Sequence, residues 1–161
     1  MEQSAHQRFI VLYEVHRVPV YHMALSLLKN PAAAEDVMQE VFLSLYETME
    51  QERMIRNIRA WLLTVTRNRC LNHLRDNRYE IPADDPPLCV EENMEDEVMG
   101  RILSGQILRC ITTEENLIFS LHCLDGYKYR EIAEGMDLPI GTVQTKCRAA
   151  RQKLKAALHD L

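Results

Sequence analysis

Apolar residues recur at helical spacing along most of this chain, and no segment alternates between apolar and polar positions for long. The first helical pattern covers residues 4–29 and contains Pro19, which we expect to kink the helix or divide it. Pro31 is placed to open a second helix over residues 32–50. A third is expected over residues 55–78. The pattern predicts an all-α fold.

The helical pattern stops at residues 79–97, which contain three prolines and eight acidic side chains but no basic one. Proline and like charge both oppose a packed core, so this segment is interpreted as an acidic linker. It separates two small helical domains, residues 1–78 and 98–161. After the linker begins we expect three or four more helices, at about residues 94–110, 114–124, 129–136 and 140–158.

The distribution of charge along the chain is more informative about nucleic-acid binding than the net charge is. A net charge of −5 argues by itself against a protein that binds nucleic acid. Residues 79–97 alone carry −8, however, whereas residues 1–78 carry +1 and residues 98–161 carry +2. The acidity is confined to the linker, and both expected domains can present basic surfaces.

Cysteine usage and apolar run length exclude several protein classes. Five cysteines, an odd number without C-x-x-C spacing or a signal peptide, indicate reduced thiols in a cytoplasmic protein. The apolar runs fall short of the ~18 residues of a membrane span, so we expect no membrane insertion. Nothing beside His122 and Cys123 completes a metal site. There is no phosphate-binding loop or catalytic arrangement either, so we expect neither a cofactor nor an enzyme.

Residues 129–158 have the pattern of a helix-turn-helix, with a short helix, a turn at residues 136–139 and a long helix. Residues 140–158 carry five basic side chains and no acidic one. In such motifs the second helix enters the major groove, where its first residues contact base edges. The predicted core face is Val143, Cys147, Ala150, Leu154 and Leu158. The predicted DNA face is Gln144, Arg148, Arg151 and Lys155.

Residues 53–78 carry seven arginines and one acid around Trp61, the only tryptophan. Arginine attracts phosphate, and aromatic or polar side chains can hold unstacked bases, so the segment suits a nucleic-acid surface. The alternative is that Trp61 belongs to the core and that the arginines are only solvated. Residues 36–42 form an amphipathic helix with a partly acidic edge, which by itself indicates capping and solvation.

Three segments together resemble the sigma-70 family, specifically its extracytoplasmic-function (ECF) group. AEDVMQEVFLSLYE at residues 34–47 resembles the region 2 helix that docks on the polymerase clamp. IRAWLLTVTRNRCLNHLR at residues 58–75 resembles the promoter-melting helix, and residues 125–154 resemble region 4. Region 4 alone is shared with response regulators, but all three in this order are specific. The resemblance implies a bacterial sigma factor that directs promoter recognition and transcription initiation.

The resemblance also implies partners and site residues. The partners would be core RNA polymerase, through its β′ clamp and β flap, promoter DNA and an anti-sigma factor. Residues 1–78 would be region 2 and residues 98–161 region 4, with the linker passing through a polymerase channel. The polymerase contacts would be Asp36, Gln39, Glu40 and Phe42. The −10 element would be held by Trp61, Arg67, Asn68, Asn72 and Arg75. The −35 element would be contacted by Thr142, Gln144, Thr145, Lys146, Arg148 and Arg151.

The chain departs from the family pattern at several positions, and two other functions stay open. Asn72 stands where an Asp is common, Ala149 where an Arg is common, and Asp137 where the turn usually has Gly. Asp tolerates a left-handed backbone better than most residues, so the turn is still expected to form. One alternative is a helix-turn-helix regulator that binds DNA as a dimer without polymerase. Another is an interaction protein that docks a partner and whose basic helices only expose a charged face to solvent.

Overall fold

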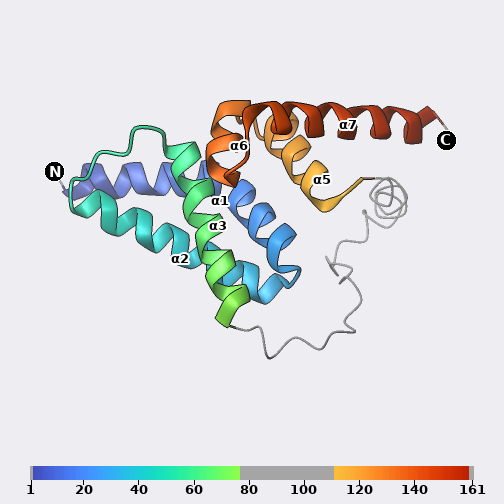
Figure 1. Cartoon of the computed structure of the whole chain (residues 1–161). Helices are drawn as coiled ribbons and strands as arrows, with labels where there is room; N and C mark the ends of the chain where they lie inside the picture. Colours follow the sequence, from blue (N-terminus) through green and yellow to red (C-terminus); the bar gives the residue numbers. More distant parts are fainter. Residues whose placement is uncertain (1, 77–110, 160–161) are drawn as a thin grey trace, which may run out of the picture. The chain divides into compact units, whose positions relative to one another are not determined.

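The computed structural model describes residues 2–76 and 111–159, and every element within these ranges is helical, which confirms the all-α prediction. The elements, labelled as in Figure 1, are α1 (Glu2–Leu28), α2 (Pro31–Glu50), α3 (Ile58–Asp76), α5 (Thr113–Phe119), the π-helical turn η2 (Ser120–Leu124), α6 (Tyr129–Met136) and α7 (Ile140–His159). The predicted linker at residues 79–97 and the predicted helix at residues 94–110 lie outside the described residues.

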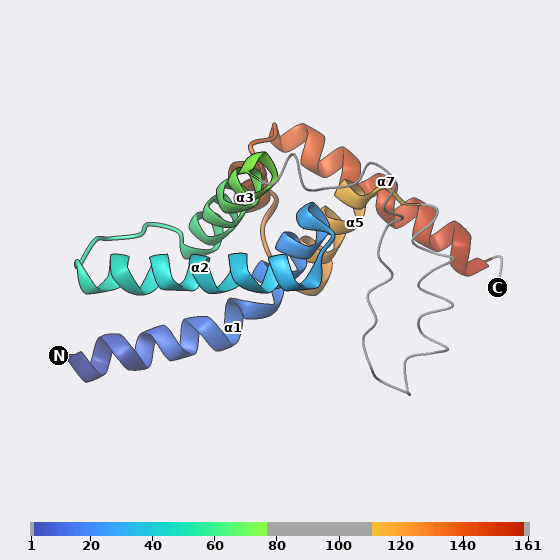
Figure 2. The same cartoon turned by 90° about the horizontal axis from the view of Figure 1, so that it is seen from below.

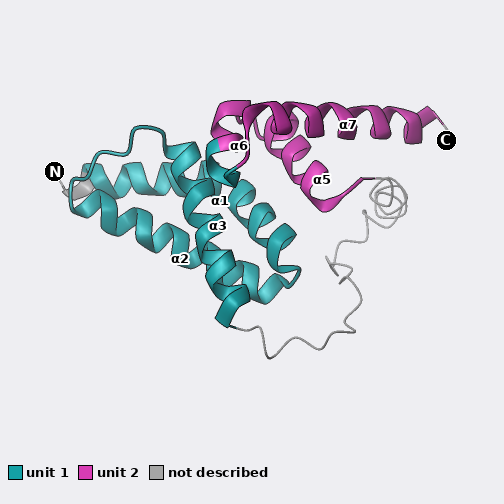
Figure 3. Ribbon diagram, in the orientation of Figure 1, with its two compact units in different colours: residues 1–88, 134–137 teal, residues 89–133, 138–161 magenta. Residues whose placement is uncertain are grey.

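The chain divides into two compact units, residues 1–88 with 134–137 and residues 89–133 with 138–161 (Figure 3). Helices α1, α2 and α3 make up the first unit, whereas α5, η2, α7 and the start of α6 belong to the second. The expected domain boundaries at residues 78 and 98 fall outside the described residues and stay predictions.

Helix α1 passes through Pro19 without being divided, so of the two predicted outcomes only a bend is compatible with the structure. Figure 2 shows α1 changing direction in its second half. Pro19 has no backbone N–H to donate, which weakens the helix locally without ending it. The helix ends at Leu28, and Lys29 follows in a left-handed conformation with φ 56°.

Helix α2 starts at Pro31 because Asn30 caps it. The Asn30 Oδ1 accepts hydrogen bonds from the backbone N–H groups of Ala32 and Ala33, at 2.9 and 3.2 Å. Proline suits the first helical position because its missing donor would be unpaired there anyway. The first turn holds no acid, so the acidic edge at residues 36–42 does not cap the helix, and Asn30 caps it instead.

Helix α3 begins at Ile58, three residues later than predicted, because Asn57 precedes it as a cap. The Asn57 Oδ1 accepts from the backbone N–H groups of Arg59 and Ala60, at 3.1 and 3.3 Å. The three helices enclose a common core, in which α3 contributes Leu62 and Cys70. The other core members are Val20, Ala24, Ala34, Val37, Val41, Phe42 and Leu45.

In the second unit, the predicted helix over residues 114–124 consists of two parts. Thr112 caps α5 by accepting from the Glu115 backbone N–H at 3.2 Å. The helix then widens into the π-helical turn η2, a conformation that apolar periodicity does not predict. The turn closes through Tyr127, whose N–H donates to the Leu121 carbonyl at 2.8 Å and whose carbonyl contacts His122 Nδ1 at 2.8 Å.

The predicted helix-turn-helix is present as α6, a turn and α7. Asp137 occupies the turn with φ 55°, the left-handed conformation anticipated for that position. Val143, Cys147 and Ala150 are buried as predicted. The predicted core stripe fails at its far end, because Leu158 is 59% exposed. Figure 1 shows that α7 continues past α5, so among the described helices of this unit α5 does not cover its last turns.

Candidate nucleic-acid and polymerase interfaces

The candidate polymerase contacts on α2 separate into an exposed and a buried group. Asp36, Gln39 and Glu40 are exposed on the outer side of the helix. Phe42 is only 3% exposed, and its ring lies 4.9 Å from the ring of Tyr13 between centroids. Phe42 is therefore a core residue of this unit, and its contact with the polymerase stays a prediction.

The candidate −10 residues of α3 lie mostly on its solvent side. Asn68, Asn72 and Arg75 are exposed, and Arg67 is half-buried. The Arg75 Nη2 donates to Asn72 Oδ1 at 3.2 Å, which aligns the two polar side chains one turn apart. Trp61 packs against the core of the unit, as the alternative interpretation expected, but it is only half-buried and remains partly exposed to solvent.

Arg69 connects the two candidate surfaces of this unit, and sequence reasoning assigned it no role. Its Nη2 donates to Ser44 Oγ at 3.0 Å, and its Nη1 lies 3.9 Å from Glu40 Oε2. The Arg69 and Glu40 side chains are 45% and 56% exposed, so the ion pair adds little stability. Its effect is positional, because it holds an acidic residue of α2 against a basic residue of α3.

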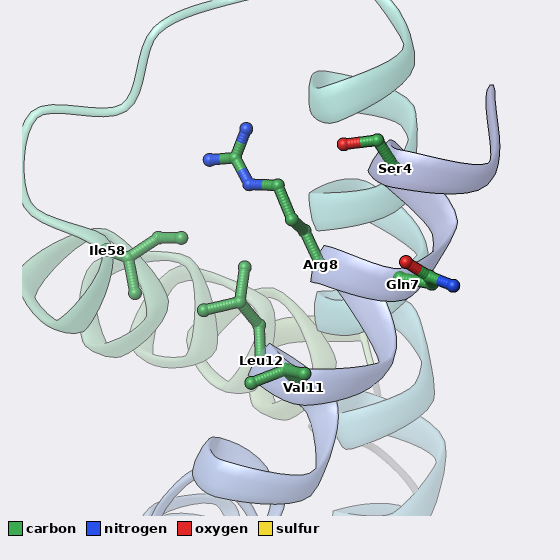
Figure 4. Close-up of a pocket in the computed structure, with 6 residues that line it drawn as sticks. All are labelled: Ser4, Gln7, Arg8, Val11, Leu12 and Ile58. Atoms are coloured by element: carbon green, nitrogen blue, oxygen red, sulfur yellow. The ribbon is translucent and has the colours of Figure 1, made fainter. Parts of the chain in front are cut away.

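A second feature that the sequence analysis missed is a pocket beside the first half of α1 (Figure 4). Its volume is about 390 Å³. Five of its six residues share one face of α1, and in Figure 4 the Arg8 side chain extends from that face into the space facing Ile58. The lining residues are Ser4, Gln7, Arg8, Val11, Leu12 and Ile58.

The candidate −35 residues lie on α7, and several are already engaged within the second unit. Thr142 and Gln144 are half-buried, and the Thr145 hydroxyl donates to the Gly141 carbonyl at 2.8 Å. The Lys146 ammonium forms an ion pair with Glu114 of α5. Lys146 must therefore exchange this partner for a phosphate if it contacts DNA.

Arg148 and Arg151 are the exposed arginines of α7. The Arg151 Nη2 donates to Cys123 Sγ at 3.3 Å. This hydrogen bond raises the pKa of the Arg151 guanidinium, and the electrostatic influence of Cys123, Cys147 and Tyr129 acts in the same direction. Cys123 lies in η2, so the π-helical turn touches the predicted DNA face of α7.

The described thiols differ in environment. Cys70, Cys123 and Cys147 are free, and burial raises the pKa of the Cys70 thiol to about 12. Within residues 2–76 and 111–159, no three side chains of His, Cys, Asp or Glu gather where a metal ion could be held. In the same part of the chain, none of the helices has both the length and the apolar character needed to cross a membrane.

Both units match known protein families. Residues 12–79 match Sigma-70 region 2, and residues 105–154 match Sigma-70, region 4. The order of the two matches along the chain is the order that the three sequence segments predicted. The match to region 2 also covers α2 and α3, where the candidate polymerase and −10 residues lie.

Curated relatives resemble the chain over nearly its whole length. The ECF RNA polymerase sigma factor SigL of Mycobacterium tuberculosis is 29% identical over 93% of this chain and 88% of its own. The ECF RNA polymerase sigma-E factor of Escherichia coli is 27% identical, over 99% and 90%. The ECF RNA polymerase sigma factor SigW of Bacillus subtilis is 24% identical, over 95% and 90%.

Solved structures share the fold. The sigma factor RpoE of Bartonella quintana, in complex with the anti-sigma factor NepR, superposes with a TM-score of 0.63 at 19% identity, covering 95% of this chain and 98% of that one. CnrH in complex with the cytosolic domain of CnrY gives a TM-score of 0.61 at 22% identity, covering 99% and 94%.

Proposed function

This chain belongs to the extracytoplasmic-function group of the sigma-70 family and is an RNA polymerase sigma factor, and from this premise we propose how its residues divide the work of initiation. The regulator that binds DNA without polymerase is not favoured, because such a protein needs no region 2. The domains are proposed as residues 1–78 for region 2, residues 79–97 for the acidic linker and residues 98–161 for region 4.

Region 2 is proposed to dock on the β′ clamp of core polymerase through the exposed side of α2. Asp36, Gln39 and Glu40 offer carboxylate and amide groups to a basic or polar partner there. Phe42 supports this surface from below, because its packing against Tyr13 holds α2 on α1. A contact of this kind is polar and partly hydrated, so it sets orientation and association rate more than affinity.

Helix α3 is proposed to hold the melted strand of the −10 element. Its exposed face combines amides, which can bond base edges, with arginines, which attract phosphate. The partly exposed ring of Trp61 is available for stacking on a base. The residues proposed for this role are Trp61, Arg67, Asn68, Asn72 and Arg75.

Helix α7 is proposed to enter the major groove at the −35 element, while region 4 as a whole binds the β flap. Gln144 can bond adenine and Arg148 can bond guanine, and Arg151 is placed one turn later to contact phosphate. Thr142, Thr145 and Lys146 complete the proposed contacts. The base preference cannot be copied from relatives, because Ala149 stands where an arginine is common.

Three further proposals concern the setting of this activity. The linker carries a charge of −8, which suits a basic polymerase channel that nucleic acid otherwise occupies. The protein is proposed to work in the cytoplasm as a non-enzymatic factor, where polymerase and DNA are found. An anti-sigma factor is a further expected partner, since the similar factor RpoE is in complex with one.

The observation that carries the proposal is the pair of exposed polar and basic helix faces, α3 and α7, one in each sigma-70 region. The test is run-off transcription with purified core polymerase on fragments of genomic DNA. We expect initiation at discrete sites only when this protein is present. A protein that neither binds core nor directs initiation on any fragment would refute the proposal, as would tight binding to palindromic duplexes that polymerase does not enhance.

A further inference from the structure

Leu43 is an exposed leucine on the outer side of α2. It is 59% exposed, whereas the residue before it, Phe42, is 3% exposed and belongs to the core of the unit. Every other large apolar residue of α2 is buried or half-buried. A helix that packs on one side normally directs its large apolar residues to that side. Leu43 is therefore an exception to the pattern of its own helix.

The exposed residues in the same helical row as Leu43 are acidic. Glu40 lies three residues before Leu43, Glu47 lies four residues after it, and Asp36 lies two turns before it, so the four share one side of α2. Gln39, also exposed, is four residues before Leu43. This row has an apolar residue in the middle and polar or charged residues on both sides of it, which is the composition of a small docking surface.

Helix α3 reaches the edge of this row through Arg69. The Arg69 Nη2 donates to the Oγ of Ser44, the residue after Leu43, at 3.0 Å, and its Nη1 lies 3.9 Å from Glu40 Oε2. Both contacts are polar, and Leu43 remains exposed beside them. The contacts restrict the position of the Glu40 carboxylate next to Leu43, so this side of the row is arranged before any partner binds.

We propose that Leu43 is the apolar anchor with which α2 docks on the β′ clamp, and that the clamp presents an apolar residue flanked by basic side chains there. This inference rests on the proposed docking of α2 and adds the residue that contributes most of the apolar burial. The three carboxylates of the row favour a basic partner and set its orientation, whereas removing Leu43 from water contributes to the affinity itself.

Leu71, an exposed leucine on α3, has different neighbours and provides a matched control. It is 43% exposed, but Arg67 and Asn68 lie one turn before it and Arg75 lies one turn after it. Such a row is basic and polar, so it does not favour a basic protein partner. The two leucines therefore separate the general effect of losing an exposed apolar side chain from a specific effect at the acidic row of α2.

The experiment measures the affinity of the full-length protein for purified core polymerase without DNA, by competition with fluorescently labelled unaltered protein. Leu43→Ala should raise the Kd about tenfold, because the exposed part of the side chain no longer passes from water into the interface. Leu43→Asn, which has a similar branched shape but is polar, should cause a comparable loss. Leu43→Met should bind within about twofold of the unaltered protein, and Leu71→Ala should bind equally well.

Two further readouts distinguish an anchor from a structural or purely electrostatic role. The Tm of Leu43→Ala should stay unchanged, since substitutions at exposed positions rarely alter stability. Its loss of affinity should persist at high salt, whereas the smaller loss caused by Glu47→Gln should shrink there, because salt screens exposed charges.

The outcomes separate the anchor from the proposed function. Leu43→Ala that binds core as tightly as the unaltered protein overturns the anchor, as does an equal loss in Leu71→Ala or a fall in Tm large enough to account for weaker binding. In each of these cases the unaltered protein still binds core, so the proposed function stands. An unaltered protein that does not bind core contradicts the proposed function and the anchor together.

Discussion

The Lys153 ammonium lies between both carboxylate oxygens of Glu115, 2.8 Å from Oε2 and 3.2 Å from Oε1. The two residues join α7 to α5 at a point where Glu115 is also hydrogen-bonded through its backbone to the capping residue Thr112. The Glu115 side chain is 13% exposed, and that of Lys153 is 40% exposed. The pair therefore helps to hold the predicted recognition helix on the rest of its unit.

Replacing Glu115 by glutamine should destabilise the second unit by about 0.5–1 kcal/mol, the range of partly exposed ion pairs. The hydrogen bond from Lys153 lowers the pKa of Glu115. Stabilisation by a depressed carboxyl is complete above its ordinary pKa of 4.5 and is lost as the pH falls through the lower folded value. Urea unfolding from pH 7 to pH 3 should show a gap between the two proteins that closes at the acid end. Lys153→Gln combined with Glu115→Gln should add little to either change alone, and full additivity would contradict the pairing.

Replacing Glu114 by glutamine should strengthen promoter binding. Glu114 pairs with Lys146, so its neutralisation frees the ammonium for phosphate and removes a negative charge near DNA. We expect a gain of about two- to fivefold in holoenzyme affinity at low salt, the value of one surface charge pair. Fluorescence anisotropy on a transcribed promoter measures it. Lys146→Ala is the matched variant, and it should lower affinity and reduce the salt slope by about 1. Equal affinities for all three proteins would show that Lys146 stays away from the phosphates.

Asn72→Ala together with Asn68→Ala should impair promoter opening while leaving stability unchanged. Both amides are exposed, so their loss creates no cavity, and changes at such positions usually stay within about 0.5 kcal/mol. Permanganate reactivity of thymines in the −10 element measures strand opening, and thermal unfolding provides the stability control. Normal opening by the double variant would remove α3 amides from the proposed strand contacts. Reduced opening with an unchanged Tm supports their role.

Asn30→Ala should destabilise region 2 by about 1 kcal/mol, because it leaves the first N–H groups of α2 without their acceptor. Thermal unfolding monitored by circular dichroism measures the change. Asn30→Ser is the conservative control, since serine can also cap a helix, and it should recover most of the loss. A Tm that is identical in Asn30→Ala and the unaltered protein would mean that Pro31 alone starts the helix.

The helices and their order could be predicted from sequence because their determinants are local. Apolar periodicity placed α2, α3, α6 and α7 to within a few residues, and Pro31 marked the start of α2. The left-handed turn at Asp137 was likewise predictable, since the preference of a single residue type decides it. The family resemblance rests on the same local segments, and its sigma-70 assignment is confirmed by the matches to regions 2 and 4.

Tertiary structure decided which side chains of those helices remain available. Phe42 belongs to an apolar stripe that could face a partner or the core, and only its packing on Tyr13 shows that it faces the core. Lys146, Arg151 and Lys153 all belong to the basic segment at residues 140–158, yet their partners lie 32, 28 and 38 residues away. Contacts between residues so far apart in the sequence form only when the helices pack, so the apolar periodicity of α7 does not predict them.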